Sequence, residues 1–476
     1  MKKEWIKPSL SEARRRTKDG VSFEYTLFSV DEDLKRLGIG KKYFIRTYGC
    51  QANERDGEHM AGILEEMKFQ KTDDIEQADV ILFNTCSIRE NANNKVFGDL
   101  GNIKHLKQSN PDIIIGLSGC MAQEEVVINK VLESYHQVDL IFGTHNIYRL
   151  PQLLAQAILS KERTIEVYSH QGDIIENLPS TRAMSHKAWV NIIFGCDKFC
   201  TYCIVPFTRG KERSRKLEDV IEEVEALKEQ GYKEVTLLGQ NVNAYGRDLD
   251  MEDGFASLLS EVAKTGIDRV RFMTSHPWNF TEGMISAMAE NNNIMPYLHF
   301  PLQSGNDDIL RAMGRRYTQA EYLEVVHKLK SRIPNLAITT DIIVGFPNET
   351  EEQFEDTLRV YDEVQYDLAY TFIYSAREGT IAANLEDNVS LVDKKQRLYR
   401  LNEKVQFYSH KNNQQYFDTE VEVLVDGPSK KNPEVYSGYT KHNKVVNFPK
   451  GDAEIGQLRK VRINEAKSWF LVGELC

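Results

Sequence analysis

Three closely spaced cysteines constrain this 476-residue chain more than any other feature of its sequence. Cys196, Cys200 and Cys203 are separated by three and then two residues, and they follow directly on the apolar run 189–194. On an α-helix these positions would line up along the axis instead of surrounding a point. A loop that wraps one small object fits the spacing better, and three thiolates can hold an iron–sulfur cluster with one iron left open for a further ligand.

Zinc is the main alternative for thiols of this kind. A structural zinc site takes four ligands, typically two Cys pairs or a Cys pair followed by a His pair. The sequence downstream of Cys203 offers neither a second Cys-x2-Cys nor a spaced His pair. A cluster with one open iron is therefore favoured over zinc and over unliganded, buried cysteines.

The same motif, with the aromatic Tyr202 before its last cysteine, resembles that of the radical S-adenosylmethionine (SAM) superfamily. The resemblance implies a 4Fe-4S cluster on Cys196, Cys200 and Cys203 whose open iron is chelated by SAM. It also implies that an electron from the cluster cleaves SAM to methionine and a 5'-deoxyadenosyl radical.

Composition narrows the class of protein further. With 41% hydrophobic and 28% charged residues, the chain is typical of a globular protein of about two to four domains. No apolar run approaches the roughly 18 residues of a membrane span, and the N-terminus lacks a signal peptide's apolar region, so we expect a cytoplasmic protein without a membrane partner. Seven cysteines favour metal or redox use over disulfides. A net charge of −11 argues against non-specific nucleic-acid binding by the whole surface, although not against a local basic patch.

Residues 1–40 form a polar N-terminal extension. Its first 20 residues carry seven basic and three acidic side chains, among them Arg14, Arg15 and Arg16. We expect a partly ordered arm that is either simply solvated, as most charge runs are, or in contact with RNA.

Between residues 41 and 160, short apolar runs alternate with amphipathic helical stretches. The runs are 43–45, 80–83, 113–115 and 140–142, and the helical stretches are 54–68, 90–107, 123–134 and 147–159. This alternation predicts an α/β domain with a doubly wound, flavodoxin-like parallel sheet.

Three further cysteines fall into register with this pattern. Cys50, Cys86 and Cys120 each lie a few residues beyond the end of an apolar run. Ligands of open parallel sheets gather beyond the carboxyl ends of the strands, so these residues can meet in one crevice. Ordinary burial as small hydrophobic side chains is the alternative.

The surrounding motifs resemble the N-terminal domain of the methylthiotransferase family. They are TYGCQAN at 47–53, NTCSIRENA at 84–92 and SGCMAQ at 118–123. The resemblance implies that Cys50, Cys86 and Cys120 hold a second, auxiliary 4Fe-4S cluster, again with one free iron.

A second repeating pattern follows a polar stretch at 161–185, which contains Pro179 and is expected to be a linker. Six apolar strands, each with a helical segment after it, lie at 189–194, 234–238, 269–273, 297–301, 336–344 and 368–374. They predict a partial (β/α)6 barrel over 186–415, with the cysteine loop after its first strand as in radical SAM enzymes. Barrel active sites lie at the C-terminal ends of the strands, where the remaining polar motifs fall.

These motifs supply the candidate cofactor contacts. By resemblance, the loop after the second strand meets the amino group of SAM, and main chain near Gly345 meets its adenine. The whole set implied for the SAM and substrate pocket is Tyr202, Gly239, Gln240, Asn241, Ser275, Gln303, Asp341, Gly345 and Arg377. As alternatives, Gly345 is a turn residue and His276 a structural histidine. No acid–base residue is expected.

From Thr419 the pattern changes to short strands at 421–425, 445–448, 461–463 and 469–472, with a turn at 426–428. This predicts a small antiparallel β-barrel over 416–476 that resembles the TRAM domain, an RNA-binding module. Between 426 and 462, eight basic residues face four acidic ones, which suits phosphate contacts, although an evenly solvated surface is the alternative. The candidate RNA contacts are Lys430, Lys431, Lys441, Lys444, Arg459, Lys460 and Arg462.

The methylthiotransferase resemblance covers nearly the whole chain from residue 41. Tyr48 and Gln51 depart from the motifs of the branches that act on threonylcarbamoyladenosine in tRNA or on a ribosomal-protein aspartate. The resemblance therefore implies methylthiolation of tRNA that carries N6-isopentenyladenosine at position 37, with two 4Fe-4S clusters and SAM as cofactors. One SAM would methylate a sulfur at the auxiliary cluster, and a second would give the radical.

The expected partners are this tRNA and a flavodoxin- or ferredoxin-like electron donor, and we expect a monomer. Three alternative functions stay open: the two neighbouring methylthiotransferase branches, and a non-catalytic tRNA-binding iron–sulfur protein.

Overall fold

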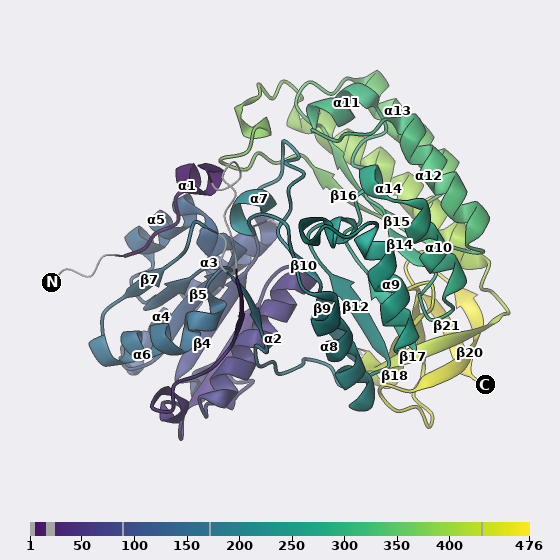
Figure 1. Cartoon of the computed structure of the whole chain (residues 1–476). Helices are drawn as coiled ribbons and strands as arrows, with labels where there is room; N and C mark the ends of the chain where they lie inside the picture. The colour runs from purple at the N-terminus through teal and green to yellow at the C-terminus, as the bar shows by residue number, and fades with distance from the viewer. Residues whose placement is uncertain (1–4, 16–23, 88–89, 171–172, 430–431) are drawn as a thin grey trace. The chain divides into compact units, whose positions relative to one another are not determined.

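A computed structural model of the chain describes residues 5–15, 24–87, 90–170, 173–429 and 432–476 (Figure 1). The chain divides into two compact units. The first comprises Met1–Ala183, Phe194–Lys198 and Ile204–Arg215, and the second comprises Met184–Ile193, Phe199–Cys203 and Lys216–Cys476. In the described ranges, no helix is both long and apolar enough to cross a bilayer.

The first unit contains a six-stranded parallel sheet. Its order is β3 (Gln70–Lys71), β2 (Lys42–Thr47), β4 (Val80–Thr85), β5 (Ile114–Gly119), β6 (Leu140–Phe142) and β7 (Thr164–Glu166). One face is covered by α2 (Gln51–Glu66) and α6 (Leu150–Ser160), and the other by α3 (Glu90–Asn102), α4 (Lys104–Ser109) and α5 (Glu125–Ser134). The expected doubly wound sheet is confirmed.

Strand β4 shows why this sequence forms a central strand. All six of its residues are buried, as is typical of a parallel strand covered on both faces. Leu82 packs in the apolar cluster with α2 and α6, whereas Ile81 and Phe83 pack in the cluster with α3, α4 and α5. The alternation of side chains along the strand therefore supplies both layers of the core.

The stretch 161–185, expected as a linker, contributes two strands. Strand β7 pairs in parallel with β6 at the edge of the sheet. Strand β8 (Ile174–Glu176) pairs with β1 (Tyr25–Leu27) of the N-terminal extension. Strands of three residues are too short to show a pattern in the sequence. Of the extension, residues 1–4 and 16–23, which include Arg16, lie outside the described residues.

The second unit contains the six expected core strands in two parallel sheets. One has the order β13 (Arg269–Phe272), β12 (Glu234–Leu238), β9 (Lys187–Asn191), and the other β14 (Tyr297–His299), β15 (Ala337–Val344), β16 (Leu368–Ile373). One apolar cluster joins both sheets to the surrounding helices. These are α8 (Leu217–Glu229), α9 (Gly254–Lys264), α10 (Glu282–Glu290), α11 (Asp307–Ala312), α12 (Gln319–Arg332), α13 (Glu351–Val364) and α14 (Leu391–Gln414).

Two of these helices begin with a signal that is visible in the sequence. Thr318 caps α12 and Thr350 caps α13, and in each case the residue three positions later, Glu321 or Gln353, bonds back to the cap. These capping boxes satisfy main-chain N–H groups that a helix N-terminus otherwise leaves unpaired.

The C-terminal part of this unit is a small closed barrel, as expected. Its strands run in the order β17 (Glu420–Ser429), β18 (Asn432–Thr440), β19 (Val445–Pro449), β21 (Leu471–Leu475) and β20 (Leu458–Ala466). In the described part of the barrel four pairings are antiparallel, whereas β19 and β21 pair in parallel.

One local expectation for this barrel was wrong, and one strand was missed. The turn expected at 426–428 lies inside β17, where the pairing with β18 shifts between Val425 and Gly427 and Gly427 has a φ of +124°. A glycine and a proline in sequence indicate a turn, but a bulge tolerates both. Strand β18 was not expected at all.

Candidate functional site

The cysteines Cys50, Cys86 and Cys120 lie just beyond the carboxyl ends of β2, β4 and β5 in the first unit. These three strands are neighbours and run parallel, so their ends meet at one edge of the sheet. This is the edge at which open α/β sheets bind ligands. Ile88 and Arg89, which follow Cys86, lie outside the described residues.

Close packing brings the three thiols together. A Cβ atom added to Gly49, which has a φ of +142°, would lie 2.6 Å from the Cβ of Cys86. Asn53 contacts the other two: its Oδ1 lies 3.4 Å from the Cys50 Sγ, and its Nδ2 lies 4.0 Å from the Cys120 Sγ. The backbone turn at Gly49 thus allows Cys50 to approach Cys86, with Asn53 reaching to Cys120.

The thiols differ in their electrostatic environment. A hydrogen bond with the Cys86 thiol lowers the pKa of Cys50 to about 6, against the opposing effect of burial. Burial raises the pKa of Cys120, and the guanidinium of Arg209 opposes that rise. The thiolate is the form that binds metal, so the neighbours of Cys50 favour a metal-binding role for that residue, whereas burial opposes the thiolate of Cys120.

Arg209 was not singled out in the sequence analysis. Its Nε lies 3.1 Å from the Cys120 Sγ, and its Nη2 lies 2.6 Å from Asp56 Oδ2. Arg209 is separated from both residues by more than 80 positions, so no sequence spacing indicates the contact. Asp56 was missed for the same reason.

The second triad lies on one loop. Cys196, in the first unit, donates its main-chain N–H to the Gly210 carbonyl at 3.0 Å. In the second unit, the N–H of Cys203 donates to the carbonyl of Cys200 at 2.9 Å. In the described ranges no three His, Cys, Asp or Glu side chains are close enough to hold a single metal ion.

A second arginine that the sequence analysis missed contacts this loop. Arg315 Nη1 lies 3.6 Å from the Cys200 Sγ, and its Nη2 donates to the Pro301 carbonyl at 3.0 Å, just after β14. Thr201 adds two bonds to the end of α11, from its N–H to the Met313 carbonyl at 2.9 Å and from its hydroxyl to the Ala312 carbonyl at 2.7 Å. These contacts fix the part of the loop in the second unit, Phe199–Cys203, at the C-terminal end of that unit's strands.

Several candidate SAM contacts also lie at this end of the second unit. The loops after β12 and β13 are joined, because Asn243 and His276 exchange two hydrogen bonds of 2.6 and 2.8 Å. After β14, Gln303 donates its N–H to the Asp341 carbonyl of β15 at 2.8 Å. Both bonds with Asn243 are made by the main chain of His276. Its side chain accepts a hydrogen bond at Nδ1 from the Trp278 N–H at 3.3 Å, which fits the alternative of a structural histidine.

Two of these candidates carry buried polar atoms that fit a bound cofactor. Ser275 Oγ and Gln303 Oε1 are buried and have no hydrogen-bond partner within the described chain. Buried polar atoms are almost always satisfied, so both are suited to a ligand that brings its own polar groups. Asn241, in the loop after β12, is also buried, and Gly239 and Gln240 precede it in that loop.

For the remaining candidate SAM contacts, Gly345, Tyr202 and Arg377, the structure shows other local contacts. Gly345 has a φ of +68° and donates its N–H to Glu349 Oε2 at 2.7 Å. This conformation fits the alternative in which Gly345 is a turn residue. Tyr202 packs with Ile343 against one apolar cluster. Arg377 lies beyond β16, where its carbonyl accepts a bond from Thr380.

The inner face of β14, β15 and β16 carries aromatic side chains. Tyr370 pairs in register with Asp341, which contacts His299, and the His299 and Tyr370 rings lie 5.9 Å apart. Phe372 follows on the same face of β16, since side chains two positions apart share a face. Tyr370 and Phe372 are 44% and 40% exposed, which is unusual for large apolar side chains within a barrel.

The outer face of β16 confirms this orientation. Thr371, between the two aromatic residues, donates to Asn402 of α14 at 2.7 Å. Tyr370 and Phe372 therefore point away from α14.

The candidate RNA contacts of the small barrel differ in their exposure and in their partners. Lys444 is buried, and its Nζ pairs with Asp367 Oδ1 at 2.6 Å. The expectation that Lys444 contacts a phosphate is therefore wrong. Lys441, Lys460 and Arg462 are exposed, although Arg462 also pairs with Asp418. Arg459 pairs with Asp452 at 2.7 Å. Lys430 and Lys431 lie outside the described residues.

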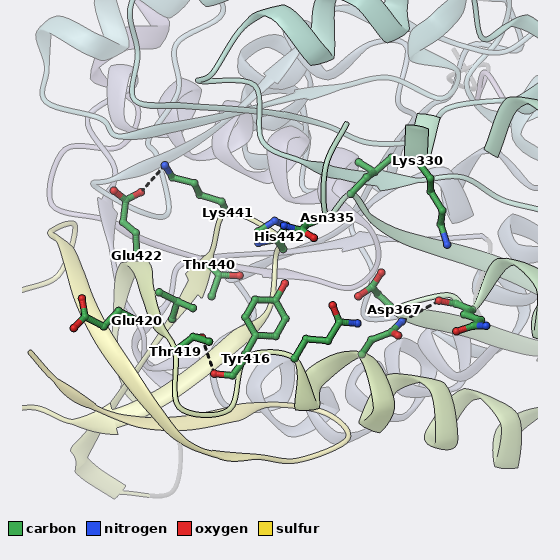
Figure 2. A pocket seen from close by; sticks show the side chains of 15 residues that line it. Lys330, Asn335, Asp367, Tyr416, Thr419, Glu420, Glu422, Thr440, Lys441 and His442 are labelled. Carbon is green, nitrogen blue, oxygen red and sulfur yellow. Dashed lines mark hydrogen bonds and ion pairs between the residues drawn. The ribbon is translucent and has the colours of Figure 1, made fainter. Parts of the chain in front are cut away.

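A separate polar cavity of about 590 Å³ lies where the small barrel meets the barrel core (Figure 2). It is lined by residues that precede β15 and β16, such as Asn335 and Asp367, and so lies at the opposite end of the strands from the cysteine loop. Tyr416 and His442 from the small barrel face each other in it, with ring centroids 5.9 Å apart. This cavity is distinct from the candidate SAM site.

Three family models match the chain in consecutive segments. The uncharacterized protein family UPF0004 matches residues 42–143, the radical SAM superfamily matches 190–360, and the TRAM domain matches 414–476. The first match contains the triad of Cys50, Cys86 and Cys120, and the second contains Cys196, Cys200 and Cys203.

Solved structures share the fold at low sequence identity. A radical S-adenosylmethionine methyltransferase, TsrM from Kitasatospora setae, solved with cobalamin and a [4Fe-4S] cluster bound, has a TM-score of 0.55 at 14% identity, covering 72% of this chain and 77% of that chain. The same enzyme with tryptophan and a SAM analogue bound has a TM-score of 0.51, again at 14% identity, over 70% and 72% of the two chains.

Curated relatives match over nearly the full length. The tRNA-2-methylthio-N(6)-dimethylallyladenosine synthase of Staphylococcus saprophyticus is 57% identical over 98% of this chain and 91% of its own length. The protein of the same name from Geobacillus kaustophilus is 56% identical over 99% of this chain and 89% of its own length. With both cysteine triads in place at strand ends, the chain belongs to the tRNA-2-methylthio-N(6)-dimethylallyladenosine synthase family of radical SAM enzymes.

Proposed function

We propose that this chain is the radical SAM methylthiotransferase that converts N6-isopentenyladenosine at position 37 of tRNA to 2-methylthio-N6-isopentenyladenosine. The observation that carries this function is the full-length identity to relatives of that name, 57% over 467 residues. The two neighbouring methylthiotransferase branches and a non-catalytic iron–sulfur protein are not favoured by these relatives.

We assign each cysteine triad to one 4Fe-4S cluster. Cys50, Cys86 and Cys120 would hold the auxiliary cluster, a proposal supported by their convergence at one sheet edge and by the Asn53 contacts. The loop cysteines would hold the cluster that binds SAM. Carbon-2 of adenine carries an unactivated hydrogen, which neither a base nor a simple nucleophile replaces under mild conditions. When bound, the reduced cluster and SAM supply the radical chemistry that opens this position.

The protein's own residues would bind and orient the reactants. Ser275 and Gln303 offer SAM polar atoms that have no partner within the described chain. Asn241, which is buried after β12, would line the same pocket. Arg315 would hold Cys200 at the end of β14. Gly239, Gln240, Asp341, Gly345 and Arg377 remain candidates by position, and Tyr202 would pack beside its own cluster.

The apolar substituent of the substrate base would lie against Tyr370 and Phe372. Their exposure within the barrel supports this placement, because an apolar five-carbon group would cover surface that water otherwise contacts. Lys441, Arg459, Lys460 and Arg462 would contact tRNA phosphates, with Lys430 and Lys431 as further candidates by sequence.

We further propose a monomer in the cytoplasm, where tRNA is modified, reduced by a flavodoxin- or ferredoxin-like protein. We propose five segments: an N-terminal extension at 1–40, an auxiliary-cluster domain at 41–160, a connecting segment at 161–185 that completes the sheet through β7, a radical SAM core at 186–415 and an RNA-binding barrel at 416–476. The pairing of β7 with β6 supports placing this segment with the auxiliary-cluster domain.

Mass spectrometry of tRNA nucleosides after anaerobic reaction with SAM and a reductant tests the function. The proposal predicts 2-methylthio-N6-isopentenyladenosine from isopentenylated tRNA. A methylthiolated threonylcarbamoyladenosine, or turnover of a ribosomal protein in place of tRNA, would assign the chain to a neighbouring branch. Absence of both product and SAM cleavage would leave only an RNA-binding role.

A further inference from the structure

The segment that follows the loop cysteines belongs to the first unit and is held there by several contacts. The Thr208 carbonyl accepts a bond from the Thr144 hydroxyl at 2.7 Å, and the Ser214 carbonyl accepts one from the Tyr25 hydroxyl at 2.8 Å. These bonds fix the backbone on both sides of Arg209, so the position of its side chain is set by the fold.

The guanidinium of Arg209 is buried between the thiol of Cys120 and the carboxyl group of Asp56. Only 7% of this residue is exposed. Its Nε points at the Cys120 Sγ, 3.1 Å away, while its Nη2 bonds to Asp56 Oδ2 at 2.6 Å. Asp56 is itself 5% exposed and lies on α2, six residues after Cys50.

This arrangement is costly unless it serves a charged neighbour. Burying a guanidinium and a carboxylate together gains little stability, and apolar residues often do as well in their place. A planar guanidinium can direct separate N–H groups at two acceptors in one plane, which the single ammonium of lysine does not reproduce. Asp56 therefore orients a cationic donor toward the sulfur of Cys120.

We propose that Arg209 is a positioning residue for the auxiliary cluster: it holds Cys120 as a thiolate ligand and raises the reduction potential of the cluster. This inference rests on the proposed function, which places a 4Fe-4S cluster on Cys50, Cys86 and Cys120. Hydrogen bonds to ligand sulfurs and nearby positive charge stabilise the reduced, more negative cluster. Loss of Arg209 removes both and leaves the Asp56 carboxylate without its partner.

The sequence position of Arg209 adds a consequence. Arg209 lies six residues after Cys203, a proposed ligand of the SAM-binding cluster. One short segment thus carries a ligand of one cluster and the arginine that serves the other.

The test isolates the auxiliary cluster in the full-length chain. In a variant with Cys196, Cys200 and Cys203 replaced by Ala, only the N-terminal triad remains to bind a cluster. Arg209→Lys and Arg209→Gln are then added separately, and Arg215→Lys serves as the matched control. Arg215 lies on the same segment, is also buried, and pairs with Glu176 at 2.7 Å. Each protein is reconstituted anaerobically, its iron is counted, and its midpoint potential is measured by redox titration followed by electron paramagnetic resonance.

Arg209→Gln, which removes the positive charge, should titrate at a more negative potential, by at least the tenfold change in the reduced-to-oxidised ratio that corresponds to about 59 mV for one electron. Arg209→Lys keeps the charge but loses the directed N–H groups of the guanidinium, so its potential should shift in the same direction by less. The Arg215 variant should match its parent. A folded Arg209 variant that binds less than half of the parent's iron also supports the positioning role. Full iron content with an unchanged midpoint in either Arg209 variant would overturn the inference. If the parent itself binds no cluster, the proposed function of the N-terminal triad fails instead.

Discussion

Arg269, on β13 of the barrel core, donates from Nη2 to Oε1 of Glu422 on β17 of the small barrel at 3.0 Å. Arg269 is 1% exposed, and its Nη1 also donates to the Tyr439 carbonyl at 2.8 Å. Arg271 reaches the same barrel through the Thr440 carbonyl at 2.8 Å. The small barrel therefore supplies acceptors to two buried cations of the core. Removing it would take away these acceptors of Arg269 and leave Arg271 with Glu234 of β12, 2.9 Å from its Nε.

Replacing Glu422 by Ala should lower the free energy of unfolding by about 1–3 kcal/mol, because a buried guanidinium loses an acceptor. Denaturant unfolding followed by circular dichroism measures the change. Asp418→Asn is the control, since its pair with Arg462 has side chains that are 69% and 55% exposed and asparagine suits the φ of +57° at this position, so it should cost less than about 1 kcal/mol. Equal effects of the two substitutions would contradict a structural role for the Arg269 pair.

The two clusters should load independently, because each triad has its own neighbours. The chain with Cys196, Cys200 and Cys203 replaced by Ala should keep one cluster after anaerobic reconstitution and should no longer cleave SAM. Iron and sulfide analysis, with an assay for 5'-deoxyadenosine, tests both expectations. The reciprocal variant of Cys50, Cys86 and Cys120 should also keep one cluster. Loss of all iron from the first variant would remove the N-terminal triad as a cluster site.

Exposed cations of the small barrel should add salt-sensitive affinity for tRNA without a part in the chemistry. Lys460→Ala should weaken tRNA binding and flatten the slope of log K against log salt by about 0.7–0.9 for one lost phosphate contact. SAM cleavage should be unchanged. Lys161→Ala, on an exposed lysine of the first unit, is the control. An unchanged salt slope in the Lys460 variant would place the phosphate contacts elsewhere.

Acidification should weaken the second unit through His442. Burial lowers the pKa of His442 to about 4 from its ordinary 6.5, and Lys444 and Arg271 act in the same direction, opposed by Asp367. The unfolded chain then binds a proton that the folded chain excludes, so stability is fully present above pH 6.5 and is lost as the pH falls toward 4. The loss should reach about 2–3 kcal/mol.

Unfolding free energies of the wild type and of His442→Phe between pH 7 and 4 test this account. The phenylalanine keeps a ring against Tyr416 but cannot titrate, so the variant should lose less stability than the wild type over this range. Parallel pH profiles of the two proteins would show that His442 makes no contribution.

The pattern of the sequence predicted most of the fold. Apolar runs such as 80–83, each followed by an amphipathic stretch, predicted four strands of the six-stranded sheet and all strands of the two three-stranded sheets, because the period of hydrophobicity is a local property. The strands it missed are short or carry turn residues. Strand β7 has three residues, and β18 begins with the turn residues Asn432 and Pro433.

The candidate site was predictable only in part. The cysteines stand out because their spacing and their position after strands are visible in sequence. Arg209 and Arg315 could not be found in this way, since each reaches its cysteine through tertiary contacts across 89 and 115 positions. The charge pattern wrongly predicted an RNA contact at Lys444, because a count of basic residues does not show which of them is buried in an ion pair, here with Asp367.

The central claim is that the isopentenyl group is required for the reaction. An apolar five-carbon group buried against Tyr370 and Phe372 can contribute several kcal/mol at about 25 cal/mol per Å². That energy can position carbon-2 of the base, and a displacement of about 1 Å can cost on the order of a hundredfold in rate. Phe372→Ala should therefore reduce the preference for isopentenylated RNA, whereas Phe407→Ala, on an exposed phenylalanine of α14, should not.

Single-turnover methylthiolation of two matched anticodon stem-loops, identical except for the isopentenyl group on adenosine 37, tests the claim most directly. The account predicts that the wild-type chain modifies the isopentenylated RNA on the order of a hundredfold faster than the unmodified one, even where both are bound to saturation. Equal rates of methylthio incorporation into the two RNAs would contradict it.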